Sequence, residues 1–279
     1  MNRTSLLKAS ATIAITLIIG VLMLACSSQT TSSNSSESIG PHSFDSELSS
    51  SSANADDDER ATSGDSASKT LACIGDSITY GYGLDYPDEQ SWPALLQARF
   101  GDEWRVVNLG VVGSTLVNEG WYPYRSTGNV ERAKELGADL YVIMLGTNDA
   151  ADPALDIESY RTQLTALVDE LSAAASQDAP SSEARESPTQ PQFVLMAPPC
   201  TFFYLADDPG ADEFNRAIGE DIRNAVQSVA AEKGAQFIDL YALTEHHPEW
   251  FPDYLHPNAD GHVAIADYLY EQVFNNSDA

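Results

Sequence analysis

Basic residues are scarce in this sequence. Among 279 residues there are 14 Lys and Arg against 42 Asp and Glu, which gives a formal net charge of −28 at pH 7. Phosphate groups are bound by clusters of Lys and Arg, so this composition argues against a nucleic-acid partner and against a polyanionic substrate. The excess acidic charge is best explained by solubility.

Cysteine is also scarce, and the first of the three cysteines closes a distinctive N-terminal segment. Residues 1–8 carry Arg3 and Lys8 without an acid, and residues 9–25 are apolar and uncharged, which is typical of a secretory signal. Met23-Leu24-Ala25-Cys26 resembles a bacterial lipobox, in which Cys26 would be diacylated and become the mature N-terminus. The alternatives are an ordinary signal peptide or an uncleaved anchor. Each of them places the rest of the chain outside the cytoplasm.

Large apolar residues are rare in the next segment, residues 27–69, which is dominated by Ser, Thr, Asn and acids. Such a composition cannot offset the entropy of ordering, and its like charges favour extension. We therefore expect a signal segment over residues 1–26, a disordered tether over 27–69 and one globular domain over 70–279.

From Thr70 onward, apolar runs alternate with segments of helical periodicity, which predicts one α/β domain with a parallel sheet. The predicted strands are Leu71–Gly75, Arg105–Leu109, Leu140–Leu145, Phe193–Ala197 and Gln236–Tyr241. The predicted helices are Trp92–Phe100, Val130–Leu136, Ile157–Ala175, Asp212–Lys233 and Asp260–Phe274. Residues Gln177–Gln192, rich in Ser and Pro, are expected to form a polar surface insertion.

Open parallel sheets place their functional sites at the carboxyl ends of the strands. The first predicted strand is followed there by Gly75-Asp76-Ser77, a turn that can present a serine hydroxyl. A serine nucleophile needs a base and a group that orients this base. Asp253 and His256, after the fifth strand, are close enough in sequence for the carboxylate to bind one imidazole nitrogen and leave the other for Ser77.

Two further segments supply donors for a developing oxyanion. Gly113 follows the second strand, where the absence of a Cβ lets the backbone N–H approach a substrate. Asn148 follows the third strand and offers a side-chain amide, and the N–H of Ser77 would be a third donor. Taken alone, Gly113 could be a turn glycine and Asn148 an Asx-turn residue.

Together, these blocks resemble the SGNH hydrolases of the GDSL esterase/lipase family. The blocks are Gly75-Asp76-Ser77-Ile78-Thr79, Gly113, Gly146-Thr147-Asn148-Asp149 and Asp253-Tyr254-Leu255-His256. The resemblance spans about residues 70–274 and implies a flavodoxin-like three-layer α/β/α sandwich with a five-stranded parallel sheet in the order 2-1-3-4-5. It implies Ser77, His256 and Asp253 as the triad, with Ser77, Gly113 and Asn148 as the oxyanion hole and no cofactor.

The resemblance also implies that Asp76 and Asp149 organise loops through backbone hydrogen bonds rather than react. In the implied strand order, the strands that carry Cys73 and Cys200 are not neighbours. We therefore expect two buried free thiols rather than a disulfide.

Other hydrolase and metal chemistries have little support in the sequence. A G-x-S-x-G elbow is absent, which disfavours the α/β-hydrolases. His246 and His247 are adjacent and do not suit one metal ion, and His262 is expected at a helix start, so no metal site is predicted and all three are expected at the surface. Trp121, Tyr122, Tyr124 and Tyr204 could form an apolar or sugar-stacking rim, or serve ordinary packing.

These observations predict an extracytoplasmic serine esterase, anchored to the membrane through Cys26, that cleaves small acyl esters through an acyl-serine intermediate. An O-acetyl group on a carbohydrate is the favoured substrate. One alternative is a lysophospholipase or thioesterase acting on longer acyl chains. Another is a non-catalytic carbohydrate-binding lipoprotein, although an intact set of nucleophile, base and orienting residue argues against it.

Overall fold

The computed structural model describes residues 69–177 and 191–275. The predicted signal segment with Cys26, almost all of the predicted tether and most of the polar insertion over Gln177–Gln192 lie outside the described residues. Within the part of the chain that is described, no helix combines the length and the apolar character needed to cross a membrane.

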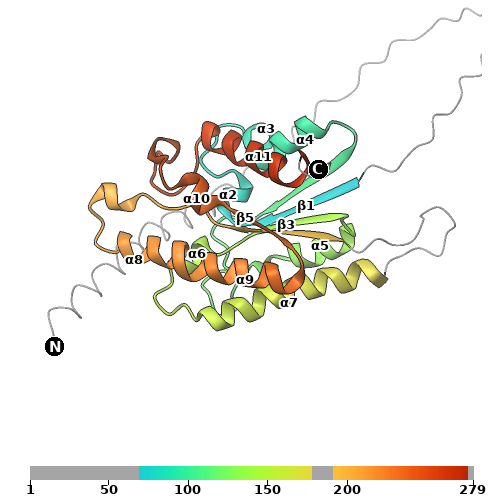
Figure 1. The fold of residues 1–279 in the computed structure, drawn as a ribbon, viewed down its shortest axis with the longest axis horizontal. Helices are drawn as coiled ribbons and strands as arrows, with labels where there is room; N and C mark the ends of the chain where they lie inside the picture. Colours follow the sequence, from blue (N-terminus) through green and yellow to red (C-terminus); the bar gives the residue numbers. More distant parts are fainter. Residues whose placement is uncertain (1–68, 178–190, 276–279) are drawn as a thin grey trace, which may run out of the picture.

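A five-stranded parallel sheet forms the centre of the domain (Figure 1). The order β2-β1-β3-β4-β5 confirms the expected topology. The strands are β1 (Lys69–Gly75), β2 (Trp104–Gly110), β3 (Leu140–Met144), β4 (Gln192–Ala197) and β5 (Gln236–Asp239). Gly75 pairs with both Gly110 and Met144, so β1, β2 and β3 end at the same level of the sheet.

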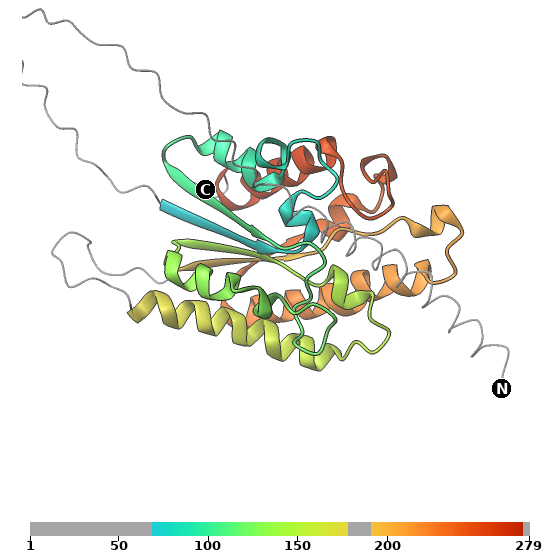
Figure 2. The same ribbon diagram turned by 180° about the vertical axis from the view of Figure 1, so that it is seen from behind.

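Helices cover both faces of this sheet, as two opposite views show (Figures 1 and 2). The helices α4 (Trp92–Phe100) and α11 (Ala259–Val273) cover one face. The other face carries α5 (Asn129–Leu136), α7 (Ile157–Gln177) and α9 (Arg223–Lys233). The shorter helices are α2 (Ser77–Tyr80), α3 (Pro87–Gln90), α6 (Thr147–Ala150), α8 (Ala211–Arg216) and α10 (Leu240–Thr244).

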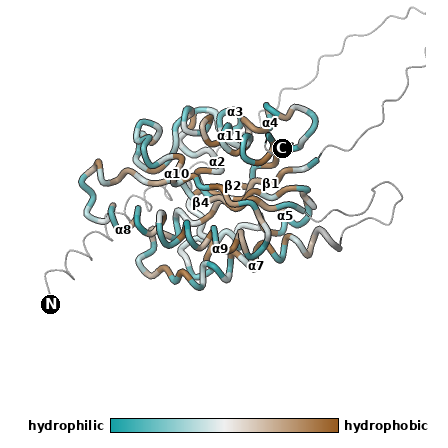
Figure 3. Tube along the Cα trace, viewed as in Figure 1, coloured by the Kyte–Doolittle hydropathy of each residue, from teal (hydrophilic) through white to brown (hydrophobic). Residues whose placement is uncertain are grey.

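The hydrophobic core consists of two clusters, one on each face of the sheet, because alternate strand residues point to opposite faces. Leu71 and Cys73 of β1 pack toward α4 and α11, whereas Ala72 and Ile74 pack toward α5, α7 and α9. The most hydrophobic residues are concentrated in the sheet (Figure 3). Cys73 and Cys200 are both buried and free, and β3 separates β1 from β4, so the prediction of two unpaired thiols is confirmed.

Two predicted elements differ from the structure. The single helix expected over Asp212–Lys233 is α8 and α9 joined by a π-helical segment, Ala217–Ile222. The fifth strand ends at Asp239 instead of Tyr241, because the Asp239 carboxylate accepts a hydrogen bond from the N–H of Ala242 and caps α10. Three 3₁₀ turns, Tyr124–Thr127, Phe203–Ala206 and Pro248–Trp250, complete the described elements.

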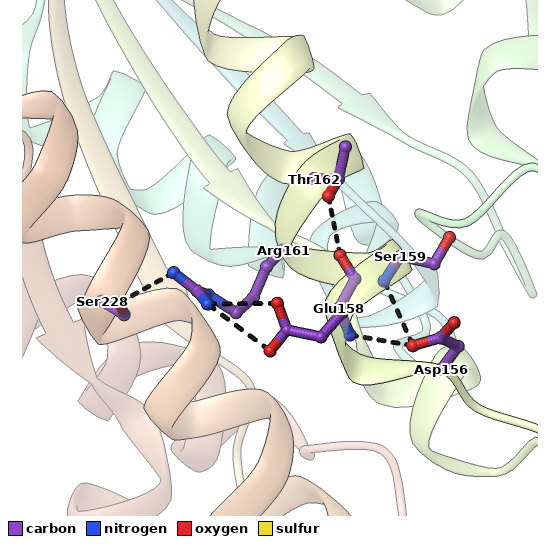
Figure 4. A network of polar contacts seen from close by, with 6 residues as sticks. All are labelled: Asp156, Glu158, Ser159, Arg161, Thr162 and Ser228. Carbon is purple, nitrogen blue, oxygen red and sulfur yellow. Dashed lines mark hydrogen bonds and ion pairs between the residues drawn. The ribbon is translucent and has the colours of Figure 1, made fainter.

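The start of α7 is fixed by local polar contacts (Figure 4). Asp156 accepts hydrogen bonds from the N–H groups of Glu158 and Ser159, which satisfies donors of the first turn. Arg161 pairs with Glu158 and donates to the Ser228 hydroxyl on α9. These contacts connect two helices on the same face of the sheet.

Candidate active site

The predicted nucleophile lies in a tight turn after β1. Ser77 is the first residue of α2 and is 4% exposed. The Asp76 carboxylate caps this helix by accepting a hydrogen bond from the N–H of Ile78 at 3.0 Å. A Cβ on Gly75 would lie 2.1 Å from Thr79 Oγ1, so the turn requires glycine at this position. The strand therefore ends in a helix start that fixes the place of the Ser77 hydroxyl.

His256 lies beside this serine. Its Nε2 is 3.0 Å from Ser77 Oγ, and its Nδ1 is 2.7 Å from Asp253 Oδ2. His256 is 1% exposed, whereas the Asp253 side chain is about half exposed. The structure thus brings Ser77, His256 and Asp253 together in the order of nucleophile, base and orienting carboxylate that a catalytic triad requires.

The spacing of Asp253 and His256 is explained by a local turn. Asp253 Oδ1 accepts hydrogen bonds from the N–H groups of Leu255 and His256, at 3.0 and 2.7 Å. Tyr254 has a positive φ of 68°, which folds the chain back within these few residues. One carboxylate oxygen therefore organises the turn while the other binds the imidazole.

The same contacts control the ionisation of Asp253. Partial burial raises the pKa of its carboxyl, but the hydrogen bond and charge of His256, with the two backbone donors, outweigh this effect and lower the pKa below its usual value. Asp253 therefore stays ionised near neutral pH. An ionised carboxylate at Nδ1 fixes the imidazole tautomer and stabilises an imidazolium.

The predicted oxyanion donors come from three segments, namely the serine turn, the loop after β2 and α6. Gly113 has a φ of 77°, in the left-handed region that favours glycine. Asn148 lies in α6 and donates one amide hydrogen to Ser114 O at 2.9 Å. The second hydrogen of this amide remains for a ligand. As the first residue of a helix, Ser77 has no intrahelical acceptor for its N–H.

Two buried carboxyls organise the surrounding loops, as predicted. Asp149 accepts hydrogen bonds from the N–H groups of Leu116 and Val117, and Asp76 caps α2. Burial raises the pKa of each carboxyl to about 6, and the backbone donors oppose this effect. Asp149 thus connects α6 to the loop that follows Gly113, and Asp76 organises the serine turn.

Tyr82 also contacts the site, and no specific sequence motif pointed to this residue. Its ring packs against the His256 ring with a centroid distance of 4.8 Å and an interplanar angle of 50°. Tyr82 directly follows Gly81, which ends α2 with a φ of 91°. Its position just after the serine turn was the available hint.

The surface position expected for His262 is wrong. This residue is fully buried, and its Nδ1 accepts a hydrogen bond from the N–H of Trp92 at 3.2 Å. Burial lowers the pKa of His262 to about 4, so it is neutral at physiological pH. His246 and His247 are exposed, as predicted. In residues 69–177 and 191–275, no cluster of three or more His, Cys, Asp or Glu could hold a metal ion.

The four aromatic residues considered for a rim divide into two groups. Trp121, Tyr122 and Tyr204 are exposed, at 41%, 37% and 47%. Tyr124 is buried, and its hydroxyl donates to Leu109 O at 2.7 Å, so a surface role for Tyr124 is wrong. Packing against the end of β2 explains this residue.

The sequence of this chain is similar to a known protein family and to a characterised relative. Residues 73–264 match the GDSL-like lipase/acylhydrolase family. An acetylxylan esterase from Xylanibacter ruminicola is 32% identical over 205 residues, which cover 71% of this chain and 42% of that protein. The chain thus spans less than half the length of this relative.

Solved structures share the fold at low sequence identity. A carbohydrate acetylesterase from Sinorhizobium meliloti is 20% identical, with a TM-score of 0.57 over 75% of this chain and 99% of that one. An acetylxylan esterase from Geobacillus stearothermophilus is 18% identical, with a TM-score of 0.54 over 74% and 94% of the two chains. The family match over most of the domain, together with the fold, shows that this chain belongs to the GDSL-like lipase/acylhydrolase family.

Proposed function

We propose that this protein removes O-acetyl groups from carbohydrates by serine esterase chemistry. The observation that carries the proposal is the contact of His256 with both Ser77 and Asp253, at 3.0 and 2.7 Å. This arrangement supplies a nucleophile, a base and an orienting carboxylate in a single site.

The chemistry proceeds in two halves. Ser77 Oγ attacks the ester carbonyl carbon while His256 Nε2 takes the hydroxyl proton. The oxyanion of the tetrahedral intermediate accepts hydrogen bonds from the N–H groups of Ser77 and Gly113 and from the Asn148 amide. The bond between the acetyl carbon and the sugar oxygen then breaks, and this leaving oxygen takes the proton from His256.

The second half restores the enzyme. A water molecule gives its proton to His256 as it attacks the acetyl-serine carbonyl, and a second tetrahedral intermediate forms. Collapse of this intermediate releases acetate, and Ser77 Oγ recovers the proton from His256. The ionised Asp253 stabilises the imidazolium in both halves.

The sugar ester is favoured by the sequence relative and by the site surroundings. The acetylxylan esterase from Xylanibacter ruminicola shares 32% identity with this chain over 205 residues. Exposed aromatic rings, which suit the apolar faces of sugars, lie in the loop that follows Gly113. The strongly negative net charge argues against anionic lipid as the substrate.

We further propose that the enzyme acts outside the cytoplasm and is anchored through an acylated Cys26. This part rests on the charge and apolar pattern of residues 1–26. Mass spectrometry of the mature N-terminus tests it. An acylated Cys26 as the first residue supports the anchor, and a mature N-terminus elsewhere without acylation refutes it.

A substrate panel tests the activity. The purified chain is assayed with acetylated xylo-oligosaccharides and with p-nitrophenyl acetate, butyrate and palmitate, and Ser77→Ala serves as the control. We expect acetate release from the oligosaccharides and a preference for acetate among the p-nitrophenyl esters. A preference for palmitate would contradict the proposed substrate class. Sugar binding without hydrolysis of any ester would contradict the enzymatic function.

A further inference from the structure

Trp121 combines an exposed ring with a fixed polar end. The residue is 41% exposed, yet its indole Nε1–H donates to Gly113 O at 3.0 Å. A tryptophan that served only as core filler would be buried. Here one end of the ring is bonded to the proposed oxyanion glycine, and a large part of the ring faces solvent.

The loop that carries Trp121 is held at several points. The N–H of Thr115 donates to Tyr122 O at 2.9 Å, and the N–H of Tyr124 donates to Thr115 O at 2.8 Å, which closes the loop on itself. The carboxylate of the buried Asp149 accepts hydrogen bonds from the N–H groups of Leu116 and Val117 in the same loop. The ring of Trp121 is therefore presented by a backbone that has little freedom to move.

Gly120 explains how the tryptophan reaches this position. A Cβ at residue 120 would lie 2.3 Å from Thr115 Oγ1, so only glycine allows the two arms of the loop to approach this closely. Thr115 is itself fully buried and donates to Val117 O. The close packing of Gly120 against Thr115 turns the chain back, so that the side chain of Trp121, the next residue, reaches Gly113 O.

The bonded end of the Trp121 ring lies at the proposed oxyanion loop. Val111, two residues before Gly113, donates its N–H to Gly75 O, beside the serine turn. Ser114, the residue after Gly113, accepts from the Asn148 amide. The loop that carries Trp121 therefore begins between the segments that hold Ser77 and Asn148, so a substrate bound at these residues would lie beside this loop.

We propose that Trp121 recognises the sugar ring of the substrate by stacking, while its N–H positions Gly113 for the oxyanion. A flat indole suits the apolar C–H face of a pyranose, and a ring that is already fixed loses little entropy on binding. This inference rests on the proposed function, because it assigns the residue that selects an acetylated sugar over a simple acetate ester. Trp121 is thus a specificity residue through its face and a positioning residue through its N–H.

Two substitutions separate these roles. Trp121→Gln removes the ring but retains an N–H donor at the same number of bonds from Cβ, whereas Trp121→Phe retains a flat face without the donor. Each variant of the full chain is assayed with tetra-O-acetyl-xylopyranose and with ethyl acetate, which has no ring to stack. Trp104→Phe is the matched control, because Trp104 is the first residue of β2 and lies at the amino ends of the strands, away from the site at their carboxyl ends.

The inference predicts a different pattern for each variant. For Trp121→Gln, kcat/KM for the sugar ester falls about tenfold, mainly through KM, while kcat/KM for ethyl acetate stays within about twofold. For Trp121→Phe, kcat falls by a similar factor on both substrates, and the preference for the sugar ester is kept. Trp104→Phe leaves the preference unchanged.

Other outcomes overturn the inference or the function on which it rests. If Trp121→Gln lowers both activities equally, or neither, Trp121 does not recognise the sugar, although the proposed function stands. If the wild-type chain hydrolyses ethyl acetate but not the sugar ester, the proposed substrate is wrong and this inference fails with it. If it hydrolyses neither ester, the enzymatic function itself is contradicted.

Discussion

His256 Nε2 lies 3.0 Å from Ser77 Oγ, although 179 residues separate the two in sequence. Only Asp76 lies between the end of β1 and Ser77. His256 belongs to the loop between the 3₁₀ turn Pro248–Trp250 and α11. A parallel sheet brings the carboxyl ends of its strands to one edge, so two distant loops meet there. The chemistry proposed for this protein depends on that contact.

Asp253→Asn tests the orienting carboxylate. The variant keeps the shape of the side chain but removes the charge that fixes His256, so kcat is expected to fall by about a hundredfold to ten-thousandfold. The rate of acetate release under saturating substrate measures this effect, with Asp260→Asn, an exposed acid in the first turn of α11, as the control. A variant within about twofold of the wild-type rate would exclude an orienting role for Asp253.

Asn148→Ala tests the oxyanion hole. Loss of one such donor typically costs about a hundredfold to a thousandfold in kcat, and KM should change little because the bond strengthens in the transition state. The matched control is Asn118→Ala, an exposed asparagine in the loop that follows Gly113. Since Asn148 also binds Ser114 O, thermal unfolding of both variants should accompany the kinetics. An increase in KM alone would assign Asn148 to substrate binding instead.

Asp149→Asn tests the buried support of the loop. Leu116 and Val117 donate to different oxygens of the Asp149 carboxyl, so an amide would leave one of these N–H groups facing an NH₂ donor, and the free energy of unfolding should fall by about 1–3 kcal/mol. Because the pKa of Asp149 is raised to about 6, its contribution to stability is greatest below pH 3.8 and declines as the pH rises through 6. Urea unfolding should therefore show a larger loss at pH 4 than at pH 7. An equal loss at both pH values would contradict the raised pKa.

His262→Gln tests the buried histidine. The folded state resists protonation of His262, whose pKa is about 4 instead of 6.5, so the wild type loses stability as the pH falls from 6.5 to 4. Glutamine can accept from the N–H of Trp92 without titrating. Relative to the wild type, the variant should gain stability toward acid, by up to about 3 kcal/mol near pH 4. A constant difference in stability between His262→Gln and wild type over this pH range would refute the assignment.

The sequence was sufficient for those parts of the fold that depend on short-range pattern. The β-branched and apolar runs and the capping residues located all five strands and the long helices, because burial on both faces leaves a clear signature. The end of β5 was placed too late because Leu240 and Tyr241 continue the apolar run, while the Asp239 cap that starts α10 is a weak local signal. The π-helical segment over Ala217–Ile222 had no signal in helical periodicity.

Ser77, Gly113 and Asn148 were predicted as candidate site residues because each follows a strand, but the packing around the candidate site depends on tertiary contacts. His262 of α11 is buried against α4 and contacts Trp92, which lies 170 residues away in sequence. Tyr124 looks like its exposed neighbour Tyr122, yet its hydroxyl binds the last part of β2. Which side of a loop faces the core is decided by contacts between distant segments, and a local pattern does not contain this information.

The most direct test of the account is covalent labelling of the nucleophile. The full chain is treated with diethyl p-nitrophenyl phosphate, which phosphorylates activated serines, and the label is located by peptide mass spectrometry while esterase activity is followed. The account predicts one label per chain, on Ser77, with activity lost in proportion and no labelling of the His256→Ala variant. Full activity after complete labelling of Ser77, or loss of activity with the label on another residue, would contradict it.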